Sequence, residues 1–159
     1  TSGGGACSNF TASRKLGQFL EKNMKTDAQL QQDVGEKRFV NQVGLEVFDM
    51  RYIDEMGMKH TMLEALKDMD DNTHLHVSFD VDFLDPAIAP GVGTTVAGGP
   101  TYREAQLCME MIADTGLLAS LDIMELNPAF DVKNQTALLA VDLVDSLFGK
   151  STLMRAWHD

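Results

Sequence analysis

The 159-residue chain is poor in several residue types, and each shortage argues against a class of protein. It has 13 lysines and arginines against 24 aspartates and glutamates, which gives a formal net charge of −11. We therefore expect no binding to nucleic acid or to an anionic membrane, because both depend on clustered basic side chains. The two cysteines, Cys7 and Cys108, form no CxxC pair. They argue against a zinc ribbon or a redox motif and are typical of reduced thiols in a cytosol.

Long apolar runs are also missing. No stretch of the sequence reaches the length of a membrane span, and no basic segment followed by an apolar one opens the chain. We expect a cytoplasmic protein without a signal peptide. The composition that is present, 44% hydrophobic and 23% charged residues, is that of one globular domain with a core of useful size. The surplus of acid is compatible with a cationic ligand or a divalent metal.

Hydrophobic spacing predicts strands that alternate with helices from residue 45 onward. We expect strands at 45–48, 74–79 and 117–124, and helices at 53–69, 101–114 and 132–148. Strands separated by single helices form crossovers, which predicts an α/β fold with a parallel sheet. The strand at 117–124 is apolar enough to be buried on both faces. In the N-terminal segment, residues 1–34, apolar positions at helical spacing predict a helix over 11–32.

Two of the predicted helices carry further local signals. The helix at 53–69 has an apolar stripe that includes Met56, Met62 and Leu63, and we expect its methionines to fill the core. The run TYRE at 101–104 predicts a capping box at the start of the next helix, and Gly116 predicts its end.

Asp80 and Asp82 stand where a predicted buried strand ends, in the run SFDVD at 78–82. In an extended chain, residues two apart point the same way, so we expect both carboxylates on one side. Two like charges at close range repel each other unless a cation lies between them, and hard divalent ions prefer oxygen ligands. Open α/β sheets also bind ligands at the carboxyl ends of their strands. The pattern favours a metal site, and the alternative is a pair of capping residues on a solvated edge.

Glu125 holds the corresponding place after the next predicted strand, in the run DIMELNP at 122–128. A carboxylate there can bind a planar guanidinium group through paired hydrogen bonds. The alternative is a charge that only ends the strand. Between the two candidate sites lies a loop rich in proline and glycine, residues 83–100, and loops of that length inside compact domains are often functional.

The histidines are not expected to join the Asp pair. His76 shares a strand face with Asp80, but a rise of about 3.3 Å per residue places it roughly 13 Å away. A shared ion reaches only about 2.2 Å to each ligand. We therefore predict structural or solvent-facing roles for all four histidines, at positions 60, 74, 76 and 158.

Taken together, these motifs resemble the arginase family of ureohydrolases. The strongest matches are SFDVD (78–82) with LDP (84–86), APGVGT (89–94), GG (98–99), YRE (102–104) and DIMELNP (122–128). The combination is very specific to that family. It divides the chain into an N-terminal segment, 1–34, that does not resemble an arginase, and an arginase-like C-terminal half-domain, 35–159.

The resemblance implies a fold, a reaction and a set of residue roles. The fold is a three-layer α/β/α arrangement with a mainly parallel sheet, present here in part. The reaction is manganese-dependent hydrolysis of L-arginine, or a related guanidino compound, to urea and ornithine, with two Mn²⁺ ions that activate water. By motif, Asp80 and Asp82 would bind manganese, and Glu125 would bind the guanidinium group as a catalytic residue. Thr94 would line the substrate pocket, and Asp85 would shape the loop behind the metal ligands.

The same resemblance shows what this chain lacks. The family's other manganese ligands come from a Gly-Gly-Asp-His motif and an Asp-Ala-His-x-Asp motif, and neither occurs in these 159 residues. Four of the usual six ligand side chains are therefore absent. One hypothesis is an arginase-like hydrolase that is catalytically incomplete as it stands. The other is a non-catalytic metal-binding or self-associating interaction module. A partial sheet exposes an edge, so we expect a homo-oligomer or association with a complementary segment.

Overall fold

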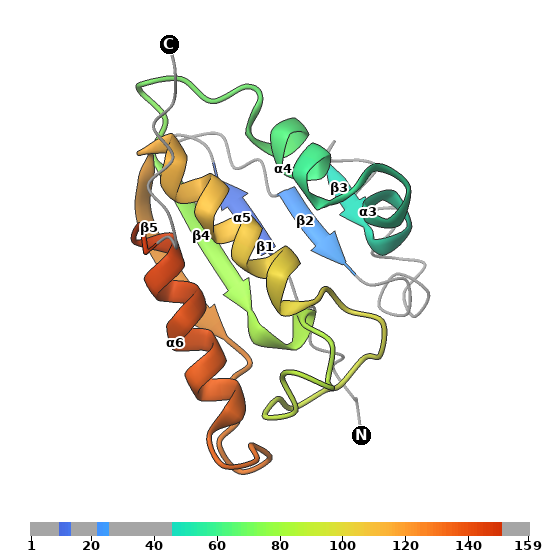
Figure 1. Ribbon diagram of the computed structural model, residues 1–159. Coiled ribbons are helices and arrows are strands. Elements are labelled where there is room, and N and C mark those ends of the chain that lie inside the picture. The colour runs from blue at the N-terminus through green and yellow to red at the C-terminus, as the bar shows by residue number, and fades with distance from the viewer. Residues whose placement is uncertain (1–9, 14–21, 26–45, 151–159) are drawn as a thin grey trace, which may run out of the picture.

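The computed structural model describes residues 10–13, 22–25 and 46–150, which form a five-stranded sheet covered by helices (Figure 1). Along the sheet the strand order is β3-β2-β1-β4-β5. The bounds are β1 (Phe10–Ser13), β2 (Lys22–Lys25), β3 (Val47–Asp49), β4 (Leu75–Asp80) and β5 (Leu118–Met124). Within this described sheet β1 runs opposite to the other strands, since it pairs antiparallel with β2 and β4 while the remaining pairs are parallel. The predicted α/β class with a mainly parallel sheet is confirmed.

The helix predicted over residues 11–32 is wrong for the described part of that segment. β1 pairs with β4, and β2 pairs with both β1 and β3. Helical spacing of apolar residues is a local signal. In a helix the backbone N–H and C=O groups bond to each other, but a neighbouring strand can bond to the same groups instead. The remaining residues of that prediction lie outside the described ones.

The helices follow the strands in the predicted alternation. They are α3 (Met50–Met56), α4 (Met58–Leu66), α5 (Tyr102–Thr115) and α6 (Gln135–Leu147). α5 packs against both α4 and α6, and the three lie over the same face of the sheet (Figure 1). Crossovers that step in one direction along a sheet keep their helices on one side, because each crossover is right-handed. Of the three expected layers, the described residues thus supply the sheet and one helical layer. Within these ranges no helix combines the length and apolarity needed to cross a bilayer.

The single helix predicted over 53–69 is two helices, separated at Gly57. This glycine has φ 80°, a value that L side chains rarely adopt, and its N–H donates to the Ile53 carbonyl. The break changes which side chains reach the core. Met62 is buried, whereas Met56 and Leu63, which the predicted apolar stripe included, are exposed.

The core lies between β4 and the helical layer. Alternate side chains of β4 are fully buried, as the period of a strand requires: Leu75, Val77 and Phe79. The helices contribute Met62, Met109, Ile112, Leu143 and Leu147, each at most 2% exposed. Burial of such a side chain stabilises the fold by about 1.5–3 kcal/mol. The prediction that the methionines of residues 53–69 fill the core is therefore confirmed for Met62 and wrong for Met56, which is 47% exposed.

Both ends of α5 agree with the sequence pattern. The Thr101 hydroxyl accepts from the Glu104 N–H, and the Glu104 carboxylate accepts from the Thr101 N–H at 2.8 Å. This is the predicted capping box, which satisfies two backbone donors at the start of the helix. At the other end Gly116 adopts the left-handed conformation with φ 65°.

β5 differs from its prediction. The sequence indicated burial on both faces, but in the described structure β5 is the last strand of the sheet, and most of its residues are exposed. Only the side of β5 that faces β4 has a strand partner among the described residues. The apolar sequence of β5 is typical of a central strand, but in the described sheet β5 is an end strand and has no second neighbour to help bury it.

Candidate active site

Asp80 and Asp82 are buried at the carboxyl end of β4, with exposed fractions of 6% and 1%. Asp80 is the last residue of the strand, and the chain then turns into a short 3-10 helix, Val81–Phe83. The extended geometry on which the same-side prediction depended therefore ends at Asp80, and that premise is wrong for Asp82. Both carboxylates are nevertheless buried at this strand end, which is uncommon for aspartate.

Parallel pairing brings Glu125 to the same edge of the sheet. The last residue of β4, Asp80, is in register with Met124, the last residue of β5. Neighbouring strands lie about 4.8 Å apart, so Met124 is the direct neighbour of Asp80. Glu125 is the next residue after Met124 and therefore lies close to Asp80. Glu125 itself is half-buried and has φ 66°, in the left-handed region that non-glycine residues seldom occupy. Such strained conformations are concentrated at functional sites.

The loop that carries Thr94 is attached to the residues around Glu125. Val92 forms an antiparallel bridge with Leu126, and the Asn127 N–H donates to the Gly91 carbonyl at 2.7 Å. A Cβ added to Gly93 would lie 3.8 Å from Glu125 Oε2, so the carboxylate lies directly against this loop. Thr94 follows Gly93 and is exposed. The structure thus brings Glu125 and the Thr94 segment together at the strand end where Asp80 lies.

Asp85 closes the base of the same loop. Its carboxylate accepts hydrogen bonds from the N–H groups of Ala87 and Gly98, both at 2.9 Å. These bonds, that of Ala87 first, hold the pKa of the Asp85 carboxyl below its usual value. A Cβ added to Gly99 would lie 2.4 Å from the Phe83 carbonyl oxygen, which shows how tightly the return of the loop packs. The role of Asp85 toward a metal stays a prediction, but its hydrogen bonds tie the two ends of the loop together.

Two residues that the sequence pattern did not single out hold the other end of the loop. The buried Gly91 N–H donates to the Thr136 hydroxyl at 2.8 Å. Asp131 accepts from the N–H group of Val132 and, in the first turn of α6, from the N–H groups of Thr136 and Ala137. Asp131 also leaves no room beside Gly91, because an added Cβ there would lie 2.6 Å from the Asp131 Cβ. An acid before a helix is a recognisable capping signal, but its proximity to Gly91 follows only from the fold.

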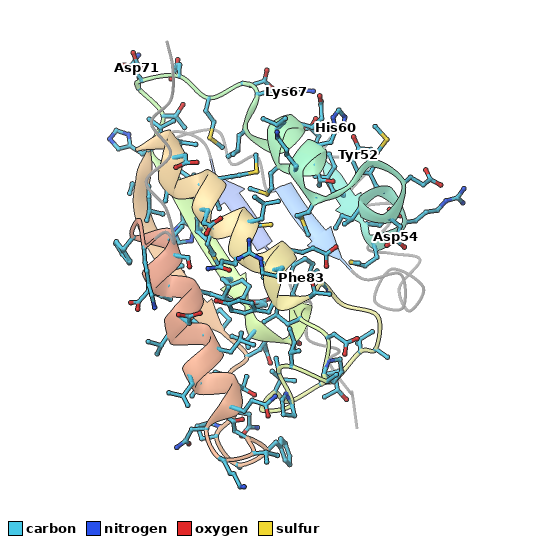
Figure 2. All side chains as sticks on the ribbon, viewed as in Figure 1. Tyr52, Asp54, His60, Lys67, Asp71 and Phe83 are labelled. Atoms are coloured by element: carbon cyan, nitrogen blue, oxygen red, sulfur yellow. The ribbon has the colours of Figure 1, made fainter. Side chains whose placement is uncertain are left out.

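The histidines lie outside this site, as expected for those that the structure describes. His76 is on β4 and binds β5 instead, with Nδ1 2.7 Å from the Ser120 hydroxyl and Nε2 3.5 Å from an Asp122 oxygen. Figure 2 shows His60 on α4, well apart from Phe83, which follows the Asp pair. His158 lies outside the described residues.

The described residues offer the right type of ligand for a divalent metal but too few ligands to hold it. Asp80 and Asp82 offer the hard oxygen donors that such ions prefer. Within residues 46–150 and the two short described strands, however, no group of three or more histidine, cysteine or acidic side chains lies close enough to hold an ion. Two carboxylates do not make a closed site, so no step of a reaction can be derived through a metal held by this part of the chain.

Comparison with known proteins agrees with the motifs at this strand edge. The model of the arginase family matches residues 26–149. The chain belongs to the arginase family. Arginase from Agrobacterium fabrum is 54% identical over 125 residues, which are 77% of this chain and 38% of that protein. Arginase from Bacillus subtilis is 45% identical over 121 residues, which are 76% of this chain and 41% of that protein.

Solved structures of the family have the same fold. The crystal structure of arginase from Bacillus subtilis aligns with a TM-score of 0.72 at 44% identity, over 76% of this chain and 43% of that one. Arginase from Bacillus caldovelox aligns with a TM-score of 0.73 at 43% identity, over 76% and 41%. This chain therefore spans about two fifths of the length of the arginases it matches.

Proposed function

We propose that this chain carries one part of an arginase-type active site and is catalytically incomplete by itself. In this proposal Asp80 and Asp82 are manganese ligands, Glu125 is the catalytic residue that binds the guanidinium group, and Thr94 lines the pocket. The complete site would hydrolyse L-arginine, or a related guanidino compound, to urea and ornithine in the cytoplasm. When bound, two Mn²⁺ ions would supply a water activated near neutral pH.

One observation supports the proposal. In this chain, which belongs to the arginase family, Asp80, Glu125 and the loop of Thr94 lie at the same edge of the sheet. The half-buried Glu125 carboxylate suits a planar cation, because two parallel N–H···O bonds fix both its position and its orientation. Asp85 and Thr136 secure the loop from its two ends. The lack of a third ligand among the described residues is the reason for proposing an incomplete site.

The first experiment measures manganese and urea with the purified chain. We expect weak Mn²⁺ binding, detected by titration of the free-ion electron paramagnetic resonance signal, and no urea release from L-arginine. Asp80→Asn should weaken that binding by at least tenfold, because it removes one of two charged ligands. Asp71→Asn is the matched control, since this exposed acid lies far from Phe83 and the end of β4 (Figure 2). Two tightly held ions with urea release, or equal binding by both variants, would contradict the proposal.

A second experiment tests Glu125 as the guanidinium site. Glu125→Gln keeps the shape of the side chain and removes its charge. Charge-assisted hydrogen bonds contribute about 1.5–3 kcal/mol, so L-arginine should bind roughly 10–100-fold more weakly to the variant. Chemical-shift titration of the Gly93 amide, which lies beside the carboxylate, reports the binding directly. Unchanged affinity would remove Glu125 from the site.

The alternative is a non-catalytic, self-associating module. The observation in its favour is the exposed, largely apolar strand β5 at the end of the described sheet. In that case the chain would form homo-oligomers and would bind neither manganese nor arginine at these residues. The two experiments above and the mass of the purified chain in solution separate the two functions.

A further inference from the structure

The segment that joins β5 to α6 contains strained backbone. Among the residues that the structure describes, those other than glycine with a positive φ are Glu125, Lys133 and Asn134. All lie in residues 125–134, which connect the lower ends of β5 and α6 in Figure 1. Such conformations persist in non-glycine residues only where the surrounding structure fixes them. The contacts of this segment must therefore hold it in place.

Glu125 lies where the chain changes its pairing partner. Up to Met124 the chain pairs in parallel with β4, and at Leu126 it pairs antiparallel with Val92, in the loop rich in proline and glycine. In a regular strand the side chain of Glu125 would point to the face opposite that of Met124. The positive φ of 66° takes Glu125 out of that alternation. The direction of its carboxylate therefore depends on where the loop holds Leu126.

Thr136 holds the loop at the residue beside that pairing. Its side chain is 0% exposed, and its hydroxyl accepts from the Gly91 N–H at 2.8 Å. The Gly91 carbonyl in turn accepts from the Asn127 N–H at 2.7 Å. A buried N–H without a partner is costly, so Gly91 keeps this place because position 136 offers an oxygen. One glycine thus links the first turn of α6 to the residues that follow Glu125.

Asp131 orients the Thr136 hydroxyl. Its carboxylate accepts from the Thr136 side chain and also from the Thr136 N–H at 3.0 Å. A hydroxyl has one hydrogen, and when that hydrogen is donated to Asp131 the oxygen lone pairs remain for Gly91. A Cβ added to Gly91 would lie 2.6 Å from the Asp131 Cβ, so the loop has no room to slide along the start of α6. These contacts fix both the hydroxyl and the glycine that it binds.

We propose that Thr136 is a positioning residue, which through Gly91 and Asn127 sets the backbone of Glu125 and so aims its carboxylate at a guanidinium group. Paired hydrogen bonds to a planar cation tolerate little misorientation. Without the hydroxyl, the link between Gly91 and Asn127 loosens and Glu125 relaxes toward an ordinary strand conformation. The aim at a guanidinium group rests on the proposed function, whereas the conformation of Glu125 is measured without a ligand.

The experiment compares Thr136→Val, which keeps the shape and removes the hydroxyl, with Thr136→Ser, which keeps the hydroxyl. Nuclear magnetic resonance of the full 159-residue chain measures hydrogen exchange of the Asn127 amide relative to the Leu75 amide at the start of β4. Thr136→Val should raise this exchange ratio by about tenfold or more. The Asn127 N–H keeps its own acceptor, the Gly91 carbonyl, so a rise reports the loosened link and not a deleted bond.

Two further readouts concern Glu125 itself. The three-bond coupling between its amide and α protons reports its φ, and Thr136→Val should shift that coupling toward the value of an extended strand. L-Arginine, followed by the Gly93 amide shift, should bind Thr136→Val about fivefold or more weakly. Thr136→Ser should keep the coupling, and its exchange ratio and arginine affinity should stay within about twofold of the unaltered chain.

Thr61→Val is the matched control. Thr61 is also 0% exposed, but its hydroxyl donates to the Gly57 carbonyl at the start of its own helix, α4. The same change of residue type therefore removes a buried hydroxyl that has no link to the site. Thr61→Val should leave the coupling of Glu125 as it is and move the exchange ratio and the arginine affinity by less than about twofold.

The outcomes separate this proposal from the proposed function. Equal effects of the two valine variants, an unchanged exchange ratio or coupling in Thr136→Val, or a changed coupling with unchanged arginine affinity would overturn the positioning role. If the unaltered chain bound no L-arginine and the coupling still changed as expected, the proposed function would fail and the control of Glu125 by Thr136 would stand.

A measurement on the unaltered chain tests the link without any substitution. The Gly91 and Asn127 amides should open together, with protection factors within about threefold of each other and the same dependence on urea. Independent opening of the two amides would overturn the proposal even if Thr136→Val did not fold.

Discussion

Replacement of Gly91 by alanine is the sharpest test of how the site loop is held. An added Cβ would lie 2.6 Å from the Cβ and Cγ of Asp131 and 2.9 Å from its Cα. Carbon atoms in contact are normally about 3.5–4.0 Å apart, so backbone must move by about 1 Å. Overpacking of this kind costs about 1–3 kcal/mol. Disturbance of the two hydrogen bonds that Asp131 accepts from the Thr136 and Ala137 N–H groups in the first turn of α6 adds about 0.5–2 kcal/mol.

We therefore expect Gly91→Ala to lower the free energy of unfolding by about 2–4 kcal/mol. For a chain of this size the midpoint of thermal unfolding falls by about 2–4 °C per kcal/mol, so the total is roughly 5–15 °C. Circular dichroism during urea and thermal unfolding measures both quantities. Gly93→Ala is the control two residues away, because its added Cβ would make only an ordinary 3.8 Å contact. Its stability should lie within about 1 kcal/mol of the unaltered chain. If the two variants were equally stable, the close packing of Gly91 against Asp131 would be refuted.

Three further predictions concern stability and reactivity. Met62→Ala should destabilise the fold by about 2–5 kcal/mol in urea unfolding, since Met62 is 1% exposed. Leu63→Ala should change the stability by less than about 0.5 kcal/mol, since Leu63 is 51% exposed on the same helix, and equal losses would contradict this difference in burial. The lowered pKa of Asp85 stabilises the fold above 3.8, the ordinary pKa of an aspartate, and that stabilisation is lost as the pH falls toward the folded pKa. The stability difference between the chain and Asp85→Asn should therefore shrink between pH 5 and 3 — a range of about two units around that value — and a constant difference would count against it. Burial raises the pKa of Cys108 to about 12, so in a Cys7→Ser background its thiol should react with a disulfide reagent at pH 8 only after unfolding, and rapid reaction of the folded chain would show that the thiol is accessible.

The parts of the fold that were predicted correctly depend on local signals. The capping box at Thr101 and the glycine stop at Gly116 are satisfied by bonds within a few residues, so no distant contact can override them. The alternating burial of β4 follows from the two-residue period of a strand. The predictions that failed needed a distant partner. Residues 10–13 and 22–25 form strands because β4 and β3 offer them hydrogen bonds. β5 is exposed because the described sheet ends there, a fact that its own apolar sequence does not contain.

By itself the sequence determined the family, the mainly parallel α/β class and the acids at two successive strand ends, since these depend on residue type and order along the chain. Only the tertiary structure decided how those acids are arranged. The 3-10 turn after Asp80, the φ of 66° at Glu125 and the attachment of the Gly91 loop through Thr136 all arise where segments distant in sequence pack together. The same packing leaves Leu138 and Val141 of α6 exposed among the described residues, because whether an apolar side chain is buried depends on which other segments reach it.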